Sequence, residues 1–205
     1  MNLHYRVQTV PARHQILPRL LHHLPVSTDV VVDEGDGPPS PWRGYLRCLT
    51  DPWPDSTTHM VILQDDVVPA DHFGIRVQQA VEQRPADIIS LFVGGLPGPA
   101  RKAFLAAQFN GEPFAPIRLA RIFHVVALVW PVDEIRSFVE WQQHARLPGP
   151  TPPRSDDAIV GYWARVTHRT FWATVPCLVE HPDDVPSTIG RKPGSPGRKA
   201  ILFAG

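Results

Sequence analysis

The sequence predicts an α/β protein whose mostly parallel, twisted sheet carries helices on both faces. Short apolar runs alternate with segments whose apolar residues recur at helical spacing, and several runs end in acidic residues or glycine. In the first half the order is strand, helix, strand, helix, strand, helix, strand, which is typical of a parallel sheet with helical crossovers. With 205 residues, the chain is long enough for one domain with a sizeable core.

The first elements follow from the pattern near the amino terminus. Residues 5–10 alternate as a strand does and stop at Pro11. Apolar side chains at positions 16, 17, 20, 21 and 24 share one helical face, which requires Pro18 to lie in the first helical turn. Residues 30–32 are three valines and predict a short buried strand, and residues 42–49 predict the next helix.

Two further strands complete the first half. Residues 59–63 are apolar and predict a strand that runs into Gln64, Asp65 and Asp66. A helix is expected after Pro69, with Asp71 as its cap. Residues 87–93 predict another buried strand.

The second half is less regular. We expect a loop-rich stretch over 96–121, a strand over 123–130 and a helix over 132–144. Prolines make 147–154 a loop, after which Ser155 is placed to cap a helix over 156–166. The last strand is expected over 171–179, before a basic stretch rich in glycine and proline.

The composition argues against several classes of protein. Lys+Arg and Asp+Glu number 20 each, so the formal net charge is +0, which fits neither a basic nucleic-acid coat nor an acidic tail. No apolar run reaches the roughly 18 residues of a membrane helix, and residues 1–10 lack a signal-peptide core, so we expect a soluble, cytoplasmic protein. Cys48 and Cys177 lie beside apolar residues without metal-type spacing, which predicts buried free thiols.

The most informative residues are Asp65 and Asp66, which lie where an apolar strand ends. Ligands of open parallel sheets bind at the carboxyl ends of strands. Two adjacent carboxylates there need a compensating charge, and Mg²⁺ or Mn²⁺ takes carboxylate oxygens while leaving positions open for phosphate. A solvated turn is the other interpretation, because Asp is common in turns.

These strand ends resemble the GT-A glycosyltransferases, which use nucleotide-sugar donors and a metal. The segment HMVILQDDVVP at 59–69 is similar to the acidic motif of the lipopolysaccharide and procollagen galactosyltransferase-like families, whose usual form is Leu-Glu-Asp-Asp-Val, with Gln64 here in place of the glutamate. The likeness continues in RVQTVPAR at 6–13, VVVDEG at 30–35, SDDAIVGYW at 155–163 and PCLVEHPDDVPSTIG at 176–190. The chain also resembles small bacterial and phage glycosyltransferases in the arrangement of these motifs.

The resemblance implies one GT-A domain over 1–205. Residues 1–95 would form a nucleotide-binding half, residues 96–190 an acceptor half, and residues 191–205 a basic lid or tail. The donor would be a UDP-sugar and the cofactor Mn²⁺ or Mg²⁺. The acceptor hydroxyl would belong to a surface glycan, a protein or a modified DNA base.

The resemblance also implies roles for the metal-binding residues. Asp66 would be the main metal ligand, and Asp65 would hold the donor ribose or sugar or share the metal. His181 would be the carboxy-terminal metal ligand, and the alternative for it is a pair with Asp183 or Asp184.

Other residues would hold the nucleotide. Asp33 would accept the uracil imide N–H, while Pro11, Ala12 and Arg13, which follow Thr9 at the end of the first strand, would wrap around the nucleotide.

A second acidic pair, Asp156 and Asp157, opens the helix expected over 156–166. An inverting sugar transfer needs a carboxylate that takes the proton of the acceptor hydroxyl, and we expect one of the two, with Asp157 favoured, to be that base. The structural alternative is capping of the helix and complementarity to its dipole. If transfer retains configuration, the pair would bind the acceptor instead.

The basic residues near the carboxy terminus have two interpretations. Arg191, Lys192, Arg198 and Lys199 would offset charge on a departing nucleotide if this segment closed over it. A solvated tail is the alternative, although the apolar residues 200–203 favour docking of the end. Two other functions also stay open for the whole chain: a metal-dependent phosphoesterase or nuclease, and a non-catalytic module that binds nucleotide-sugars.

Overall fold

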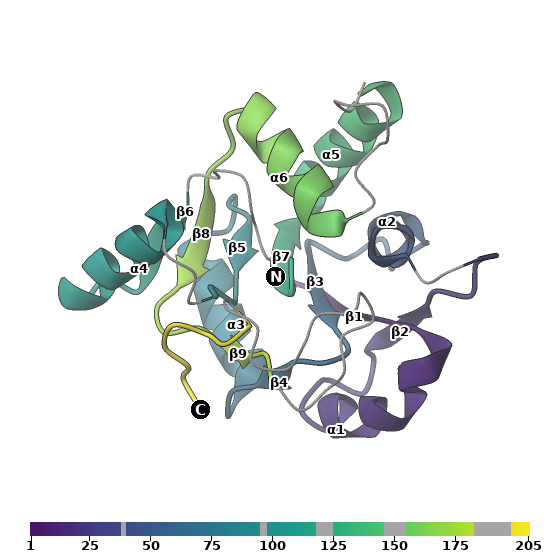
Figure 1. Cartoon of the computed structure of the whole chain (residues 1–205), viewed down its shortest axis with the longest axis horizontal. Coiled ribbons are helices and arrows are strands. Elements are labelled where there is room, and N and C mark those ends of the chain that lie inside the picture. The colour runs from purple at the N-terminus through teal and green to yellow at the C-terminus, as the bar shows by residue number, and fades with distance from the viewer. Residues whose placement is uncertain (38–39, 95–97, 118–124, 146–154, 183–197) are drawn as a thin grey trace.

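A seven-stranded sheet with helices on both faces forms the centre of the molecule (Figure 1). The computed structural model describes residues 1–37, 40–94, 98–117, 125–145, 155–182 and 198–205. The strands are β1 (Leu3–Thr9), β2 (Asp29–Val32), β3 (His59–Gln64), β4 (Val68–Pro69), β5 (Ile89–Ser90), β6 (Phe114–Ile117), β7 (Ala127–Pro131), β8 (Phe171–Thr174) and β9 (Val179–Glu180). The helices are the 3₁₀-helix η1 (Pro11–Ile16) and the α-helices α1 (Leu17–Leu21), α2 (Pro41–Thr50), α3 (Phe73–Gln83), α4 (Pro99–Phe109), α5 (Val132–His144) and α6 (Asp156–Val166).

The main sheet is mixed, in the order β2-β1-β3-β7-β5-β8-β6. The β2-β1-β3 half is parallel throughout, and β5 pairs in parallel with β8. β7 runs antiparallel to β3 and β5, and β6 runs antiparallel to β8. The expected α/β architecture is therefore present, with antiparallel strands inserted into its second half. β4 and β9 form a separate two-stranded sheet.

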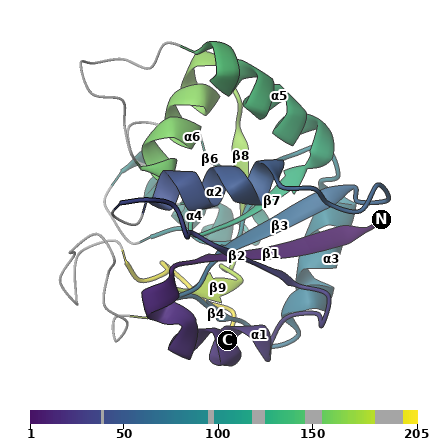
Figure 2. The same ribbon diagram turned by 90° about the vertical axis from the view of Figure 1, so that its right-hand side faces the viewer.

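The helices form a layer on each side of the sheet (Figure 2). Buried residues of α2, α4, α5 and α6 belong to one apolar cluster, which includes Trp130 and Trp163. Buried residues of α1 and α3 belong to the other, which includes Leu20 and Val77. Fully burying a large apolar side chain stabilises the fold by about 1.5–3 kcal/mol, so both faces contribute to stability.

Most of the predicted elements are confirmed. α5 and α6 have the predicted bounds, and β1, β2 and β3 lie where the apolar runs predict them. Pro18 lies in the first turn of α1, as its missing N–H requires. β2 is less buried than expected because it is an edge strand, and only Val31 of its three valines is buried.

Several local predictions are wrong. The strand expected over 87–93 is confined to β5, and Ser155, expected to cap α6, makes no side-chain capping bond. The stretch expected to be loop-rich contains α4 and β6. Asp71 is not the cap of α3, because His72 precedes the helix in a left-handed conformation and makes no side-chain capping bond. The strand expected over 171–179 is two strands, β8 and β9, which belong to different sheets.

Two predictions from composition can also be compared with the structure. Cys48 and Cys177 are buried free thiols, as expected. Of the helices in the described part of the chain, none has the length and apolar character needed to cross a membrane.

Candidate functional site

The carboxyl ends of β1, β2 and β3 lie side by side and form one edge of the sheet, called here the carboxyl edge. Thr9 is paired with Val32, and Gln8 with Gln64, so the three strands end at nearly the same level. The backbone N–H of Asp33 continues the ladder by donating to the Thr9 carbonyl at 2.9 Å. The residues that follow these strands, including the two acids after Gln64, are thereby gathered at one place.

Asp65 is held by residues that follow or end β1. The Thr9 hydroxyl donates to Oδ2 of Asp65 at 2.6 Å, and Nη1 of Arg13 donates to Oδ1 at 2.6 Å. Burial nevertheless raises the pKa of Asp65, because it outweighs the lowering effect of Arg13 and of the Thr9 hydrogen bond. Asp65 is thus a desolvated carboxyl group with a hydrogen-bond partner on each oxygen.

Asp66 is surrounded by three basic side chains. Its Oδ2 atom lies 2.9 Å from Nη1 of Arg13, 3.4 Å from Nε2 of His181 and 3.9 Å from Nη2 of Arg198. Burial acts to raise the pKa of Asp66, but the hydrogen bond and charge of His181 and the charge of Arg13 lower it to about 2. Its Oδ1 atom is buried and has no hydrogen-bond partner among the described residues.

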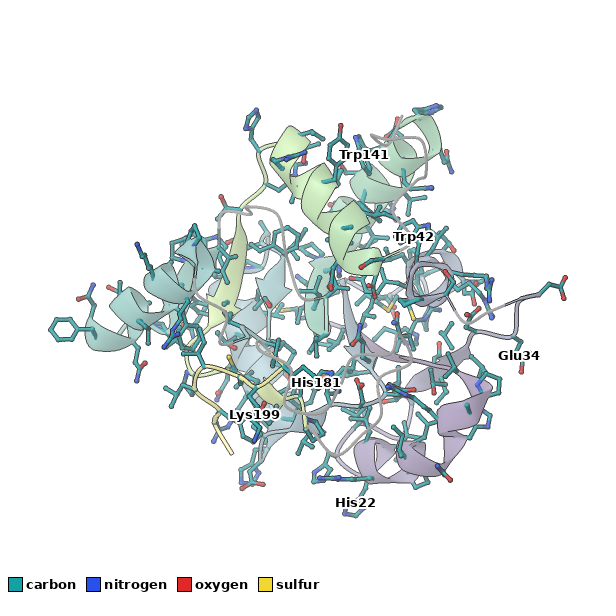
Figure 3. All side chains as sticks on the ribbon, in the orientation of Figure 1. His22, Glu34, Trp42, Trp141, His181 and Lys199 are labelled. Atoms are coloured by element: carbon teal, nitrogen blue, oxygen red, sulfur yellow. The ribbon has the colours of Figure 1, made fainter. Side chains whose placement is uncertain are left out.

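The small β4–β9 sheet explains why His181 lies beside Asp66. β4 begins two residues after Asp66, and its Val68 pairs with Glu180, the residue before His181. Oε1 of Glu180 also accepts hydrogen bonds from the backbone N–H groups of His181 and Ala200, both at 2.8 Å. Figure 3 shows His181 near the middle of the molecule in this view, whereas Glu34 projects from its outer edge.

Arg198, expected to offset charge on a departing nucleotide, lies beside Asp66 and His181, a contact that the sequence did not indicate. Its side chain is 5% exposed, and its Nη2 atom lies 3.3 Å from Nδ1 of His181. The signal was the apolar segment that follows it, since Ile201 donates to the Val93 carbonyl and thereby docks this end of the chain. Arg191 and Lys192, expected to act with Arg198, lie outside the described residues.

Asp33 pairs with α2. It accepts hydrogen bonds from the Arg43 guanidinium and, at 2.8 Å, from the backbone N–H of Ser40. Burial acts to raise the pKa of Asp33, but these bonds hold it below its ordinary value. Pro11 and Ala12, expected to wrap around the nucleotide, lie at the start of η1 and are exposed.

Asp156 is the first residue of α6, and its side chain contacts the end of β3. Nε2 of Gln64 donates to its Oδ2 atom at 3.4 Å, and Gln8 also donates to this carboxylate. Burial raises the pKa of Asp156 in spite of these hydrogen bonds. Sequence reasoning missed both glutamines as partners of this acid; their shared position at the ends of paired strands was the available signal.

Asp157 has a different environment from its neighbour. Its Oδ1 atom accepts a hydrogen bond from the backbone N–H of Val125 at 2.7 Å, which joins α6 to the segment before β7. Asp156 is buried and Asp157 is only partly buried, so a bound molecule has better access to Asp157.

The fit of a divalent cation to this site is partial. Within the described ranges, no three His, Cys, Asp or Glu side chains are grouped so as to hold a metal ion by themselves. Asp66 and His181 do fit, because Oδ1 of Asp66 is an orphaned buried acceptor and the imidazole lies beside Oδ2. Mg²⁺ commonly takes one or two carboxylates and fills its other positions with water and substrate phosphates.

Comparison with known proteins adds no family assignment. No protein-family model matches the chain, and a search of curated proteins finds no match either.

Proposed function

We propose that this protein is a metal-dependent glycosyltransferase that moves a sugar from a UDP-sugar to an acceptor hydroxyl. The observation that supports this most directly is the buried group formed by Asp65, Asp66 and His181, with Arg13 and Arg198, at the carboxyl edge. Open α/β sheets bind ligands at this edge, and alternating acids and bases suit a cation together with a diphosphate.

In this proposal the diphosphate is bound beside Asp66. Asp66 and His181 would hold the cation, whose charge, when it is bound, stabilises the departing nucleotide. Arg198 is buried next to both residues, so its guanidinium adds a fixed positive charge at the same place. Asp33 orders the residues after β2 through Arg43 and would use a remaining lone pair for the uracil imide N–H.

The acceptor would be deprotonated by Asp157. A general base must contact the hydroxyl from which it takes the proton, and the partly exposed Asp157 meets this need better than Asp156. Asp156 is then a positioning residue, because Gln8 and Gln64 anchor it and with it the start of α6. The balanced net charge gives a DNA acceptor no general electrostatic support, so a glycan hydroxyl is the acceptor we propose.

Calorimetric titration with UDP tests the binding half of the proposal. We expect UDP to bind the wild-type protein more tightly with Mn²⁺ than with a chelator, and Asp66→Ala to abolish the difference. Asp133→Ala is the matched control, since Asp133 is an exposed acid that pairs with Arg136 on α5. Equal UDP affinity with and without Mn²⁺ in the wild type would contradict metal dependence.

A product assay tests the reaction. Incubation with Mn²⁺, a panel of UDP-sugars and glycan acceptors should release UDP and form a glycosylated product, and Asp157→Asn should lower the rate at least 100-fold. Tight UDP binding with every UDP-sugar left intact would instead indicate a binding module. Release of phosphate or cleavage of oligonucleotides would indicate a phosphoesterase or nuclease.

A further inference from the structure

One nitrogen atom of Arg13 bridges the two acids at the carboxyl edge. Nη1 lies 2.6 Å from Oδ1 of Asp65 and 2.9 Å from Oδ2 of Asp66. The Arg13 side chain is 12% exposed and each carboxylate 5%, so this ion pair is largely removed from water. The two acids therefore already have a cation between them, supplied by the chain itself.

The proposed function places a divalent cation on Asp66 and His181, and Nη1 of Arg13 and Nε2 of His181 both contact Oδ2 of Asp66. Mg²⁺ lies about 2.0–2.1 Å from its oxygen ligands, closer than Nη1 lies to either carboxylate oxygen. A cation held by Asp66 and His181 would therefore compete with Nη1 of Arg13 for the Asp66 carboxylate. The two positive charges would also repel each other at that distance.

A second observation indicates that Arg13 does not satisfy the site fully. Oδ1 of Asp66 is buried without a hydrogen-bond partner among the described residues, and an unpaired buried acceptor is destabilising. His181 lies on the other oxygen of the same carboxylate. The unpaired Oδ1 atom, on a carboxylate whose Oδ2 atom contacts both Arg13 and His181, points to a further ligand.

Arg13 is placed so that its side chain can move without the sheet. It lies in η1, directly after β1, and its backbone N–H donates to the Val10 carbonyl at 2.9 Å. Rotation about its side-chain bonds would carry the guanidinium away from the acids while this backbone contact stays in place. The released charge would remain at the carboxyl edge, where the proposed function places the diphosphate.

We propose that Arg13 is a built-in counter-ion, which a divalent cation displaces from Asp65 and Asp66 and which then pairs with the donor diphosphate. The inference rests on the proposed function for the identity of the cation and the diphosphate. It makes binding of the two cooperative: the cation alone must break the Arg13 ion pairs, whereas a diphosphate gives the released guanidinium a new partner. The coupling is reciprocal, so each ligand raises the affinity for the other by the same factor.

Titration with Mn²⁺ alone, without nucleotide, tests the displacement. We expect Arg13→Gln to bind Mn²⁺ at least tenfold more tightly than the wild type, because the competing charge is gone. Arg13→Lys keeps the charge and should stay within a few-fold of the wild type. Arg19→Gln, at an exposed position of α1, is the matched control and should leave the affinity unchanged. Equal or weaker Mn²⁺ binding by Arg13→Gln would overturn the proposal.

A measurement on the wild-type protein covers the case in which Arg13→Gln does not fold. Mg²⁺ should shift the NMR resonance of the Arg13 Nε–H group, assigned through Arg13→Lys, and a resonance that does not move at saturating Mg²⁺ would overturn the displacement. The two proposals fail separately. Tighter Mn²⁺ binding by Arg13→Gln supports the counter-ion even if no sugar is transferred, and sugar transfer with unchanged Mn²⁺ affinity overturns the counter-ion alone.

Discussion

Asp65 and Asp66 are neighbours in the sequence, yet their surroundings shift their pKa values in opposite directions. Burial is the largest influence on both carboxyl groups. At Asp65 burial prevails and the pKa is raised, whereas at Asp66 the additional partner His181 reverses the balance and the pKa falls to about 2. The charge of Asp66 therefore stabilises the fold, and the charge of Asp65 does not.

Substitution of each acid by asparagine should separate these effects. Without metal at pH 7, we expect Asp66→Asn to lower the free energy of unfolding by about 2–4 kcal/mol, because it leaves Arg13, His181 and Arg198 without their shared partner. Asp65→Asn should cost about 1 kcal/mol or less, because it also removes a buried charge. Urea unfolding measures both, and equal losses would contradict the assignment.

The same pair predicts how stability depends on pH. The folded pKa of Asp66, about 2, lies below its ordinary value of 3.8, so its charge contributes stability that is present above about pH 4. This contribution, roughly 2 kcal/mol, is lost as the pH falls through 2. The difference in unfolding free energy between the wild type and Asp66→Asn should therefore be smaller at pH 3 than at pH 7. A difference that is constant with pH would show that the Asp66 charge is not what stabilises the folded state.

At the scale of elements, the sequence predicts what is periodic and misses what depends on distant contacts. α5 and α6 are predicted to the residue because their apolar spacing is regular. α4 is missed because its apolar residues lie on both faces: Phe104 is buried, while Phe109 is 91% exposed. The split of the last strand depends on pairing with β4, which no local pattern reveals.

The candidate site follows the same division. The alignment of strand ends, and with it the gathering of Asp33, Asp65 and Asp66, follows from the order of elements and could be predicted. The individual pairings of Asp65 and Asp66 could not be predicted from local pattern, because their partners come from side chains far away in the chain. Arg13 is more than 50 residues from the two acids that it bridges, and Arg198 reaches Asp66 only because residues after it dock on the fold.

The contact between β3 and α6 gives a prediction for Gln64. Its amide donates to the buried carboxylate of Asp156, and Gln64→Glu would set two carboxylates against each other there. We expect the variant to lose about 1–3 kcal/mol of unfolding free energy at pH 7.5. Each acid disfavours ionisation of the other, which raises their folded pKa values, so much of the loss should be recovered at pH 5.

Chemical denaturation at the two pH values measures this effect. Gln83→Glu, at an exposed position of α3, is the control and should change stability little at either pH. If Gln64→Glu were as stable as the wild type at pH 7.5, the amide of Gln64 would not be what compensates Asp156.

The small β4–β9 sheet gives a further prediction at this scale. Oε1 of Glu180 joins the backbone of β9 to that of the carboxy-terminal segment, residues 198–205, through the N–H groups of His181 and Ala200. Glu180→Ala should cost about 1–3 kcal/mol, and Glu180→Gln, which keeps an acceptor oxygen, should cost less. Thermal or urea unfolding measures the two losses, and equal losses would mean that these hydrogen bonds contribute nothing.

At the scale of the whole molecule, the two cysteines report on different parts of the fold. Cys48 lies in α2, within the cluster under α5 and α6, and its carbonyl accepts a hydrogen bond from the buried Arg6 at 3.0 Å. Cys177 lies beside β9, where its backbone exchanges hydrogen bonds with Leu202 and Ala204 of the carboxy-terminal segment. Burial raises the pKa of Cys48 to about 12 and that of Cys177 to about 11, so neither thiol reacts readily while the fold is closed.

Thiol labelling at pH 8, read for each cysteine by mass spectrometry, should therefore measure opening of the fold at two places. The carboxy-terminal segment contributes only a few pairing contacts to the sheet, so we expect it to detach before the central cluster opens. Cys177 should then be labelled faster than Cys48 at low urea concentrations, and Glu180→Ala should speed labelling of Cys177 without changing that of Cys48.

Near the unfolding midpoint the two rates should converge, because global unfolding exposes both thiols. Identical rates in both proteins at every urea concentration would show instead that the segment and the core open as one cooperative unit, in which case Arg198 is held beside Asp66 by the full stability of the fold.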